Sequence, residues 1–175
     1  MRLFIAIELS EEMKKEIIRS QRILKSDMEE GRLTQKENLH ITVVFLGEVA
    51  ENRIGLIKET MNRIQESPFL LQMKGLGRFS KKGGDLWYRE VSLDSALLRI
   101  YDILSRELKR NGFQIEDRRF SPHITIARQV KCKKKQEISF TDVMQPVDSL
   151  SLMKSEQIKG KMVYTPIYKK ILTPI

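Results

Sequence analysis

The sequence predicts an α+β fold in one domain over residues 1–175. Three amphipathic helix patterns are interspersed among about seven strand-like segments. Several of these strands follow one another as hairpin-like neighbours, whereas a doubly wound parallel sheet would alternate strands and helices throughout. No linker or low-complexity tract divides the chain.

The N-terminal region predicts two strands, each followed by a helix. Leu3 to Leu9 and Asn38 to Gly47 are apolar runs typical of buried strands. Ser10 is a good N-cap for the first helix, and Pro68 stops a second helix predicted from Glu51 to Glu66. The apolar positions that recur at helical spacing are Met13, Ile17, Leu24 and Met28 in the first helix, and Ile54, Ile57, Met61 and Ile64 in the second.

The rest of the chain predicts a hairpin, a third helix and three further strands. Phe69 to Phe79 and Leu86 to Val91 flank a glycine-containing loop, which favours a hairpin. Asp94 can cap a helix that runs to Arg110 and ends near Gly112. The remaining strands are predicted at Ser121 to Arg128, Asp148 to Ser155 and Met162 to Leu172.

Composition limits the classes of function. With 32 Lys and Arg against 23 Asp and Glu, the net charge is +9, which favours polyanionic partners but also fits mere solubility. No stretch is long enough for a membrane span or a secretory signal, so we expect a cytoplasmic protein without membrane association. Cys132 is the single cysteine, which excludes an intramolecular disulfide and a cysteine-based metal cluster.

The two histidines are the most informative residues. Each is followed two positions later by threonine, in His40-Ile41-Thr42 and His123-Ile124-Thr125. On a strand, side chains alternate between faces, so each histidine shares a face with its threonine while the isoleucine faces the core. If the two segments belong to related halves of the fold, two imidazoles and two hydroxyls could meet across one cleft.

This set of side chains suits phosphodiester hydrolysis without a metal. One neutral imidazole can deprotonate an attacking water while the other, protonated, donates to the leaving oxygen. The threonine hydroxyls would bind the phosphoryl oxygens. From the residues alone, either histidine could fill either role.

Two other interpretations of the histidines remain. An isolated histidine in an apolar strand is usually a hydrogen-bonded structural residue, although a matched pair favours chemistry. Two histidines without a neighbouring Cys, Asp or Glu seldom form a catalytic zinc site, so we expect no metal and no other cofactor.

The chain resembles the two-histidine phosphoesterases, and among them the bacterial and archaeal RNA 2′,3′-cyclic phosphodiesterases, also described as 2′-5′ RNA ligases. The resemblance rests on the opening strand from Met1 to Ile7, on the first signature from Leu39 to Gly47 and on the second from Phe120 to Arg128. Gly75 to Phe79, Leu86-Trp87 and the C-terminal segment from Gly160 are also similar to the family's strands.

The resemblance implies a single catalytic domain of two similar lobes, with antiparallel sheets lining a central cleft and helices outside. It implies that His40 is the proton donor, that His123 is the proton acceptor and that Thr42 and Thr125 hold the phosphate. The product would be a 2′-phosphomonoester, and the reverse reaction would join RNA ends through a 2′-5′ bond. We expect a monomer, although nothing in the sequence fixes the oligomeric state.

The remaining candidate residues depend on local geometry. Arg128 could bind phosphate only if its strand ends, twists or bulges after Thr125, because simple alternation turns it to the opposite face. A cluster of lysines at 131 and 133–135 could steer RNA toward the cleft. The aromatic side chains that could stack on a nucleobase, or simply pack in the core, are Phe45, Phe79, Trp87 and Phe120.

The main hypothesis is hydrolysis of a 2′,3′-cyclic phosphate at an RNA end. The same site could instead act on a small cyclic nucleotide, an ADP-ribose cyclic phosphate or a 2′-5′-linked oligonucleotide. A protein that binds RNA without cleaving it is the alternative from another class, and intact histidines in both motifs argue against it.

Overall fold

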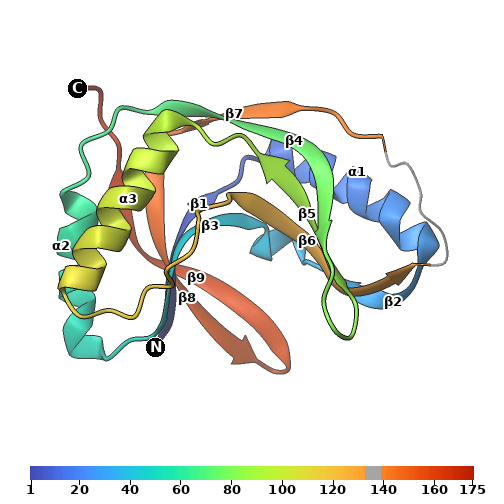
Figure 1. The fold of residues 1–175 in the computed structure, drawn as a ribbon, viewed down its shortest axis with the longest axis horizontal. Coiled ribbons are helices and arrows are strands. Elements are labelled where there is room, and N and C mark those ends of the chain that lie inside the picture. Colours follow the sequence, from blue (N-terminus) through green and yellow to red (C-terminus); the bar gives the residue numbers. More distant parts are fainter. Residues whose placement is uncertain (133–138) are drawn as a thin grey trace.

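The computed structural model describes residues 1–132 and 139–175, and it confirms the predicted α+β class with two antiparallel sheets (Figure 1). The first sheet has the order β3-β1-β8-β9, and the second has the order β2-β6-β5-β4-β7. The strands of the first sheet are β1 (Arg2–Glu8), β3 (His40–Glu48), β8 (Ser149–Ile158) and β9 (Lys161–Ile171). The strands of the second are β2 (Met28–Leu33), β4 (Phe69–Phe79), β5 (Asp85–Val91), β6 (His123–Cys132) and β7 (Val143–Val147).

In the described residues, three α-helices lie outside the sheets, and the chain passes repeatedly from one sheet to the other. The helices are α1 (Glu11–Asp27), α2 (Ile54–Asn62) and α3 (Ser95–Arg110). Helix α1 follows β1 but contacts β2, β6 and β7 of the second sheet, whereas α3 follows β5 but contacts β3 of the first. Each sheet, with the helix that contacts it, therefore contains segments from both halves of the chain, and no linker divides the fold into two parts (Figure 1).

The helix caps, the hairpin and the helix-ending glycine predicted from the sequence occur at the predicted positions. The Ser10 hydroxyl accepts a hydrogen bond from the Met13 amide at the start of α1, and Asp94 accepts one from the Ala96 amide at the start of α3. Strands β4 and β5 form the predicted hairpin. Gly112 ends α3 with a φ of +82°, a conformation that favours glycine.

Most predicted strand ends shift by one to three residues, and the boundaries of α1, α2 and β6 need correction. Met28 is not part of the α1 stripe, because the helix ends at Asp27 and Met28 begins β2, where it pairs with Cys132. Helix α2 is shorter than predicted, since a 3₁₀ turn covers Glu51–Arg53 and the helix ends at Asn62. Strand β6 is longer and continues to Cys132.

Strands β2 and β7 were not predicted, and both are edge strands. The residues of β2 are mostly polar and exposed, so the strand has no apolar alternation and is set by its pairing with β6. Strand β7 contains Pro146, which is tolerated at a sheet edge but argues against a strand when read from sequence.

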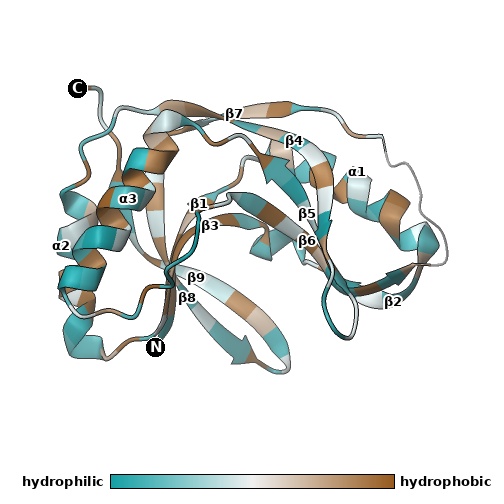
Figure 2. Cartoon of the chain, in the orientation of Figure 1, coloured by the Kyte–Doolittle hydropathy of each residue, from teal (hydrophilic) through white to brown (hydrophobic). Residues whose placement is uncertain are grey.

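The core lies between the sheets and the helices that cover them. Strand β1 is flanked by β3 and β8, and its residues from Leu3 to Ile7 are all buried. Hydrophobic and hydrophilic residues alternate along the helices (Figure 2), and apolar helix residues such as Met13, Ile57 and Leu104 are buried. No helix in the described part of the chain is both long and apolar enough to span a bilayer.

Among residues 1–132 and 139–175, one charged side chain is fully buried in this core. Arg89 of β5 has no exposed surface, and its guanidinium lies 3.5 Å from Glu16 of α1 and 3.2 Å from the Ser20 hydroxyl. It also donates to the backbone carbonyls of Lys74 and Thr141. Because a buried cation must have such partners, this network ties α1 to the second sheet.

Candidate active site

The two histidines begin the two strands that meet between the sheets. His40 is the first residue of β3 and His123 is the first residue of β6. These strands contact each other, although they belong to different sheets. The structure thus brings the two predicted motifs to one cleft.

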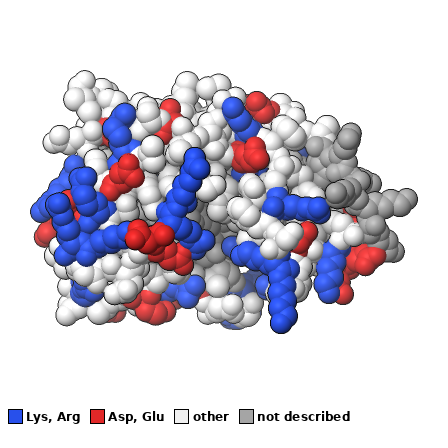
Figure 3. Space-filling model, viewed as in Figure 1, with Lys and Arg blue, Asp and Glu red and all other residues white. Residues whose placement is uncertain are grey.

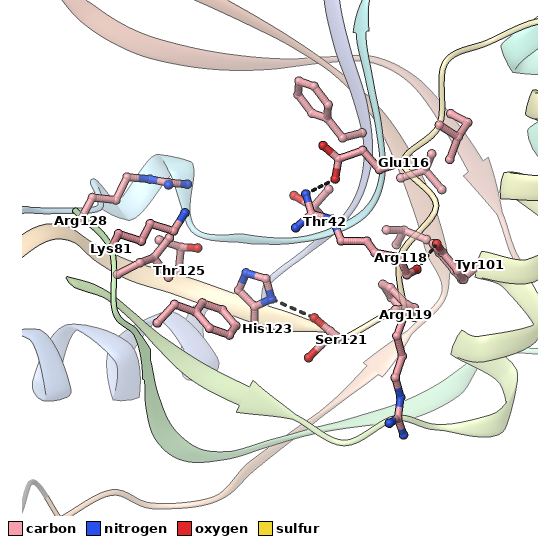
Figure 4. Close-up of a pocket in the computed structure, with 17 residues that line it drawn as sticks. Thr42, Lys81, Tyr101, Glu116, Arg118, Arg119, Ser121, His123, Thr125 and Arg128 are labelled. Carbon is pink, nitrogen blue, oxygen red and sulfur yellow. Dashed lines mark hydrogen bonds and ion pairs between the residues drawn. The ribbon is translucent and has the colours of Figure 1, made fainter. Parts of the chain in front are cut away.

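A cavity of about 540 Å³ lies at this junction. Thr42, His123, Thr125 and Arg128 line its wall, as Figure 4 shows. His40 is not among the lining residues, but its Nε2 atom is 2.8 Å from the hydroxyl oxygen of Thr42, which is one of them. The wall also contains Val43, Val44, Phe45, Phe79, Lys81, Leu86, Tyr101, Ile115, Glu116, Arg118, Arg119, Phe120 and Ser121.

Both imidazole rings are oriented in the same way. His40 Nδ1 lies 2.7 Å from the Asn38 carbonyl oxygen, and His123 Nδ1 lies 2.8 Å from the Ser121 carbonyl oxygen. A carbonyl oxygen only accepts hydrogen bonds, so Nδ1 carries the proton in each ring. In each neutral ring Nε2 is therefore the basic atom, and it is this atom that can exchange a proton with a ligand.

Each histidine ring also packs against two aromatic rings. The ring centroid of His40 lies 4.9 Å from that of Phe4 and 5.2 Å from that of Tyr164. The centroid of His123 lies 5.7 Å from Phe79 and 5.4 Å from Tyr88. Phe4, Tyr88 and Tyr164 come from strands far from the motifs in sequence, and no local pattern identifies them as neighbours of a histidine.

The environment of His40 favours its neutral form. Burial lowers the pKa of His40 below its ordinary value of 6.5, and the positive charges of Arg128 and His123 lower it further. The hydrogen bond to the Asn38 carbonyl acts in the opposite direction. In the absence of a ligand, His40 is therefore mostly neutral at pH 7.

We expect His40 to titrate below pH 6.5 in the ligand-free protein. Because the chain has only two histidines, the imidazole Cε1–H signal of His40 can be followed by NMR as the pH changes, and comparison with His123→Ala assigns that signal. The unfolded chain binds this proton more readily than the folded one, so the contribution of His40 to stability falls as the pH drops below 6.5. A His40 curve centred at or above 6.5 would contradict the assigned effect of burial.

Each motif strand has a bulge directly after its threonine, and this bulge determines which of the following side chains face the cleft. In β3 the pairing with β1 skips Val43, and in β6 the pairing with β5 skips Ile126. Each skipped residue directly follows the motif threonine, and the alternation of faces is reset there. Phe45 and Arg128, each five residues after its histidine, consequently lie on the cleft side of the wall. The condition for a phosphate role of Arg128, a bulge after Thr125, is met.

The four candidate aromatic residues are not equivalent. Phe45 and Phe79 line the cavity and are 45% and 39% exposed, although Arg2 lies over the Phe45 ring and Phe79 stacks on Tyr88 at a centroid distance of 4.5 Å. Phe120 also lines the cavity but is less exposed, and its ring is stacked on Tyr101 at a centroid distance of 4.3 Å. Trp87 is not on the wall and packs against the core instead. The greater exposure of Phe45 and Phe79 therefore makes them the stronger candidates for contact with a base.

The positive charge of the chain is partly gathered at this site. Lys81, Arg118, Arg119 and Arg128 line the cavity, and basic side chains flank the hollow in the middle of this face (Figure 3). The first three lie in loops, where sequence offers no pattern that singles them out. Of the predicted lysine cluster, Lys131 pairs with Glu30, and the lysines at 133–135 lie outside the described residues. No group of three or more His, Cys, Asp or Glu side chains that could hold a metal ion occurs in residues 1–132 and 139–175.

Comparison with known proteins identifies the family. The sequence matches the LigT-like phosphoesterases over residues 7–87 and 91–164. The chain belongs to this family. An RNA 2′,3′-cyclic phosphodiesterase of Thermotoga maritima is 32% identical over 97% of this chain and 94% of its own length. A protein of the same description from Methanocaldococcus jannaschii is 36% identical over 73% of this chain and 71% of its own.

Solved structures of LigT-like phosphoesterases share the fold. Escherichia coli LigT in complex with 3′-AMP superposes with a TM-score of 0.86 at 26% identity, and the match covers 99% of this chain and 98% of LigT. The complex of the same enzyme with ATP gives a TM-score of 0.81 at 25% identity over the same shares of both chains. These matches confirm the predicted two-histidine phosphoesterase fold.

Proposed function

We propose that this chain hydrolyses RNA 2′,3′-cyclic phosphate ends to 2′-phosphomonoesters by acid–base catalysis with two histidines. The observation that carries the proposal is the pair of imidazoles at the junction of β3 and β6. In each of them a backbone carbonyl binds Nδ1, which leaves Nε2 to exchange a proton. The relatives described as RNA 2′,3′-cyclic phosphodiesterases support the substrate class.

In the proposed reaction, water attacks phosphorus and the bond between phosphorus and O3′ breaks. His123 Nε2 accepts the proton of the attacking water, and protonated His40 donates its Nε2 proton to O3′. Because burial lowers its pKa, protonated His40 is a stronger acid than an ordinary imidazolium. The same burial means that only a small fraction of His40 is protonated in the ligand-free protein. The negative charge of the bound phosphodiester favours the imidazolium form, so binding of the substrate supplies the acid.

The hydroxyls of Thr42 and Thr125 and the guanidinium of Arg128 would hold the phosphate oxygens. All three side chains lie on the cavity wall. The Thr42 hydroxyl contacts His40 Nε2 in the ligand-free state, so it must turn toward the phosphate when the substrate binds. A nucleobase would stack against Phe45 or Phe79.

The proposal is tested with a short RNA that ends in a 2′,3′-cyclic phosphate and with protein treated with EDTA. We expect hydrolysis to continue without added metal and to leave a 2′-phosphate, identified by NMR of the product or by a 2′-phosphate-specific phosphatase. A 3′-phosphate product would retain the chemistry but reverse the roles of the two histidines. A cyclic phosphate that binds tightly and stays uncleaved for hours would favour the binding-only alternative.

A second activity follows from the reversibility of this chemistry. At high RNA concentration, the 5′-hydroxyl of a second RNA could attack the phosphorus of the cyclic phosphate in place of water; the bond between phosphorus and O3′ breaks, O3′ takes up a proton, and a 2′-5′ linkage results. We propose it only as a side reaction of the same site. Small cyclic nucleotides are the alternative substrates, and Escherichia coli LigT has been solved in complex with 3′-AMP and with ATP, so a related protein binds mononucleotides.

A further inference from the structure

The cavity carries more positive charge than one phosphodiester requires. Among the described side chains on its wall, four are cationic, and the only acidic one is Glu116. A cyclic phosphodiester has a single negative charge, and Arg128 lies in the same strand as His123 and Thr125, where it can neutralise that charge. Arg118 lies in a different segment, the connection between α3 and β6.

The backbone around Arg118 is held in place by α3. The Tyr101 hydroxyl donates to the Arg118 carbonyl oxygen at 3.3 Å. The Tyr101 ring stacks on Phe120 with an interplanar angle of 5°. Lys109 Nζ also lies 2.8 Å from the Asp117 carboxylate, but this exposed ion pair adds little. An arginine whose backbone is held in this way by a helix loses less conformational entropy when it binds a ligand.

The side chain of Arg118 is available to an anion. It is 75% exposed, extends along the cavity wall and forms an ion pair with Glu116 (Figure 4). Because an exposed ion pair contributes little free energy, a phosphate can compete with Glu116 for this guanidinium. The guanidinium of the next residue, Arg119, points away from the labelled site residues in the same view.

We propose that Arg118 binds the phosphate on the 5′-oxygen of the terminal nucleoside. A 2′,3′-cyclic end occupies both O2′ and O3′ of the last ribose, so the only other phosphate of that nucleoside is attached to O5′. Arg118 then recognises a ribonucleotide that continues in the 5′ direction, and it distinguishes an RNA end from a nucleoside cyclic phosphate. This inference rests on the proposed hydrolysis of cyclic phosphate ends.

The test compares three substrates with the same base: a nucleoside 2′,3′-cyclic phosphate, its 5′-phosphorylated form, and a dinucleotide that ends in the cyclic phosphate. For the unaltered protein we expect kcat/KM to be about tenfold higher for the two substrates with a 5′ phosphate, the effect of one charge-assisted hydrogen bond. Arg118→Gln should abolish this preference and change kcat/KM for the nucleoside substrate by less than about twofold. Arg118→Lys should restore part of it.

Arg119→Gln is the matched control, because it removes the same charge from the adjacent position. We expect it to leave the preference unchanged. If Arg118→Gln and Arg119→Gln reduced the preference equally, general electrostatic attraction would explain it in place of a site at Arg118. If Arg118→Gln lowered kcat/KM equally for all three substrates, Arg118 would act on the scissile phosphate. Either result overturns the inference. No preference in the unaltered protein would also overturn it. Failure to hydrolyse any of the three substrates would instead overturn the proposed function.

Discussion

Replacing His123 with alanine is expected to lower kcat on an RNA 2′,3′-cyclic phosphate by about 10²- to 10⁴-fold, the usual contribution of a general acid or base. His123 lies on the cavity wall, and no other described imidazole can replace it, because His40 is held on β3 by Asn38 and Thr42. Since the variant loses an interaction made in the transition state, KM should change little. Initial rates at several substrate concentrations give both constants.

The His123→Ala variant must be shown to be folded. His123 is only partly buried, so we expect its thermal unfolding midpoint to stay within a few degrees of that of the unaltered protein. His40→Ala should cause a similar loss of activity but a greater loss of stability, because His40 is buried deeply enough to lower its pKa and also loses its contact with the Thr42 hydroxyl. Activity within tenfold of the unaltered protein in either folded variant would exclude catalysis by two histidines.

The chemistry of the site could be predicted from sequence because the motifs are local. His40 and Thr42 share a strand face by simple alternation, as do His123 and Thr125. The residues beyond each threonine could not be placed in this way, because a bulge after Thr42 and another after Thr125 reset the alternation. A bulge is stabilised by the neighbouring strand, so the single strand carries no signal for it.

The parts of the fold that escaped prediction depend on contacts distant in sequence. Arg89 reads as an ordinary charged residue of a strand, yet Glu16 and Ser20 of α1 allow it to be fully buried. Strand β2 exists because β6 offers it hydrogen-bond partners. In the same way, α1 follows β1 in sequence but packs on the sheet that does not contain β1. Local propensity reports none of these pairings.

Replacing Thr125 with valine is expected to lower kcat/KM by about 10²-fold, because removal of one preorganised donor to a developing negative charge has an effect of this size. Valine keeps the branched shape, so the β6 backbone and the position of His123 should be preserved. Thr125→Ser is the matched control, since it retains the hydroxyl and should keep activity within about fivefold of the unaltered protein. Rates are compared under conditions of limiting substrate, where kcat/KM is measured directly.

Thr42→Val should have at least the same effect on kcat/KM, with one further consequence that separates the two threonines. The Thr42 hydroxyl lies 2.8 Å from His40 Nε2, so the variant also removes the only described hydrogen-bond partner of that atom. We therefore expect the His40 imidazole signals to shift in NMR spectra of Thr42→Val but not of Thr125→Val. If Thr125→Val retained activity within threefold, its hydroxyl would not bind the phosphate, and Arg128 would be left to hold the phosphate from β6. If the His40 signals shifted equally in both variants, the contact between Thr42 and His40 would not account for the difference between the two motifs.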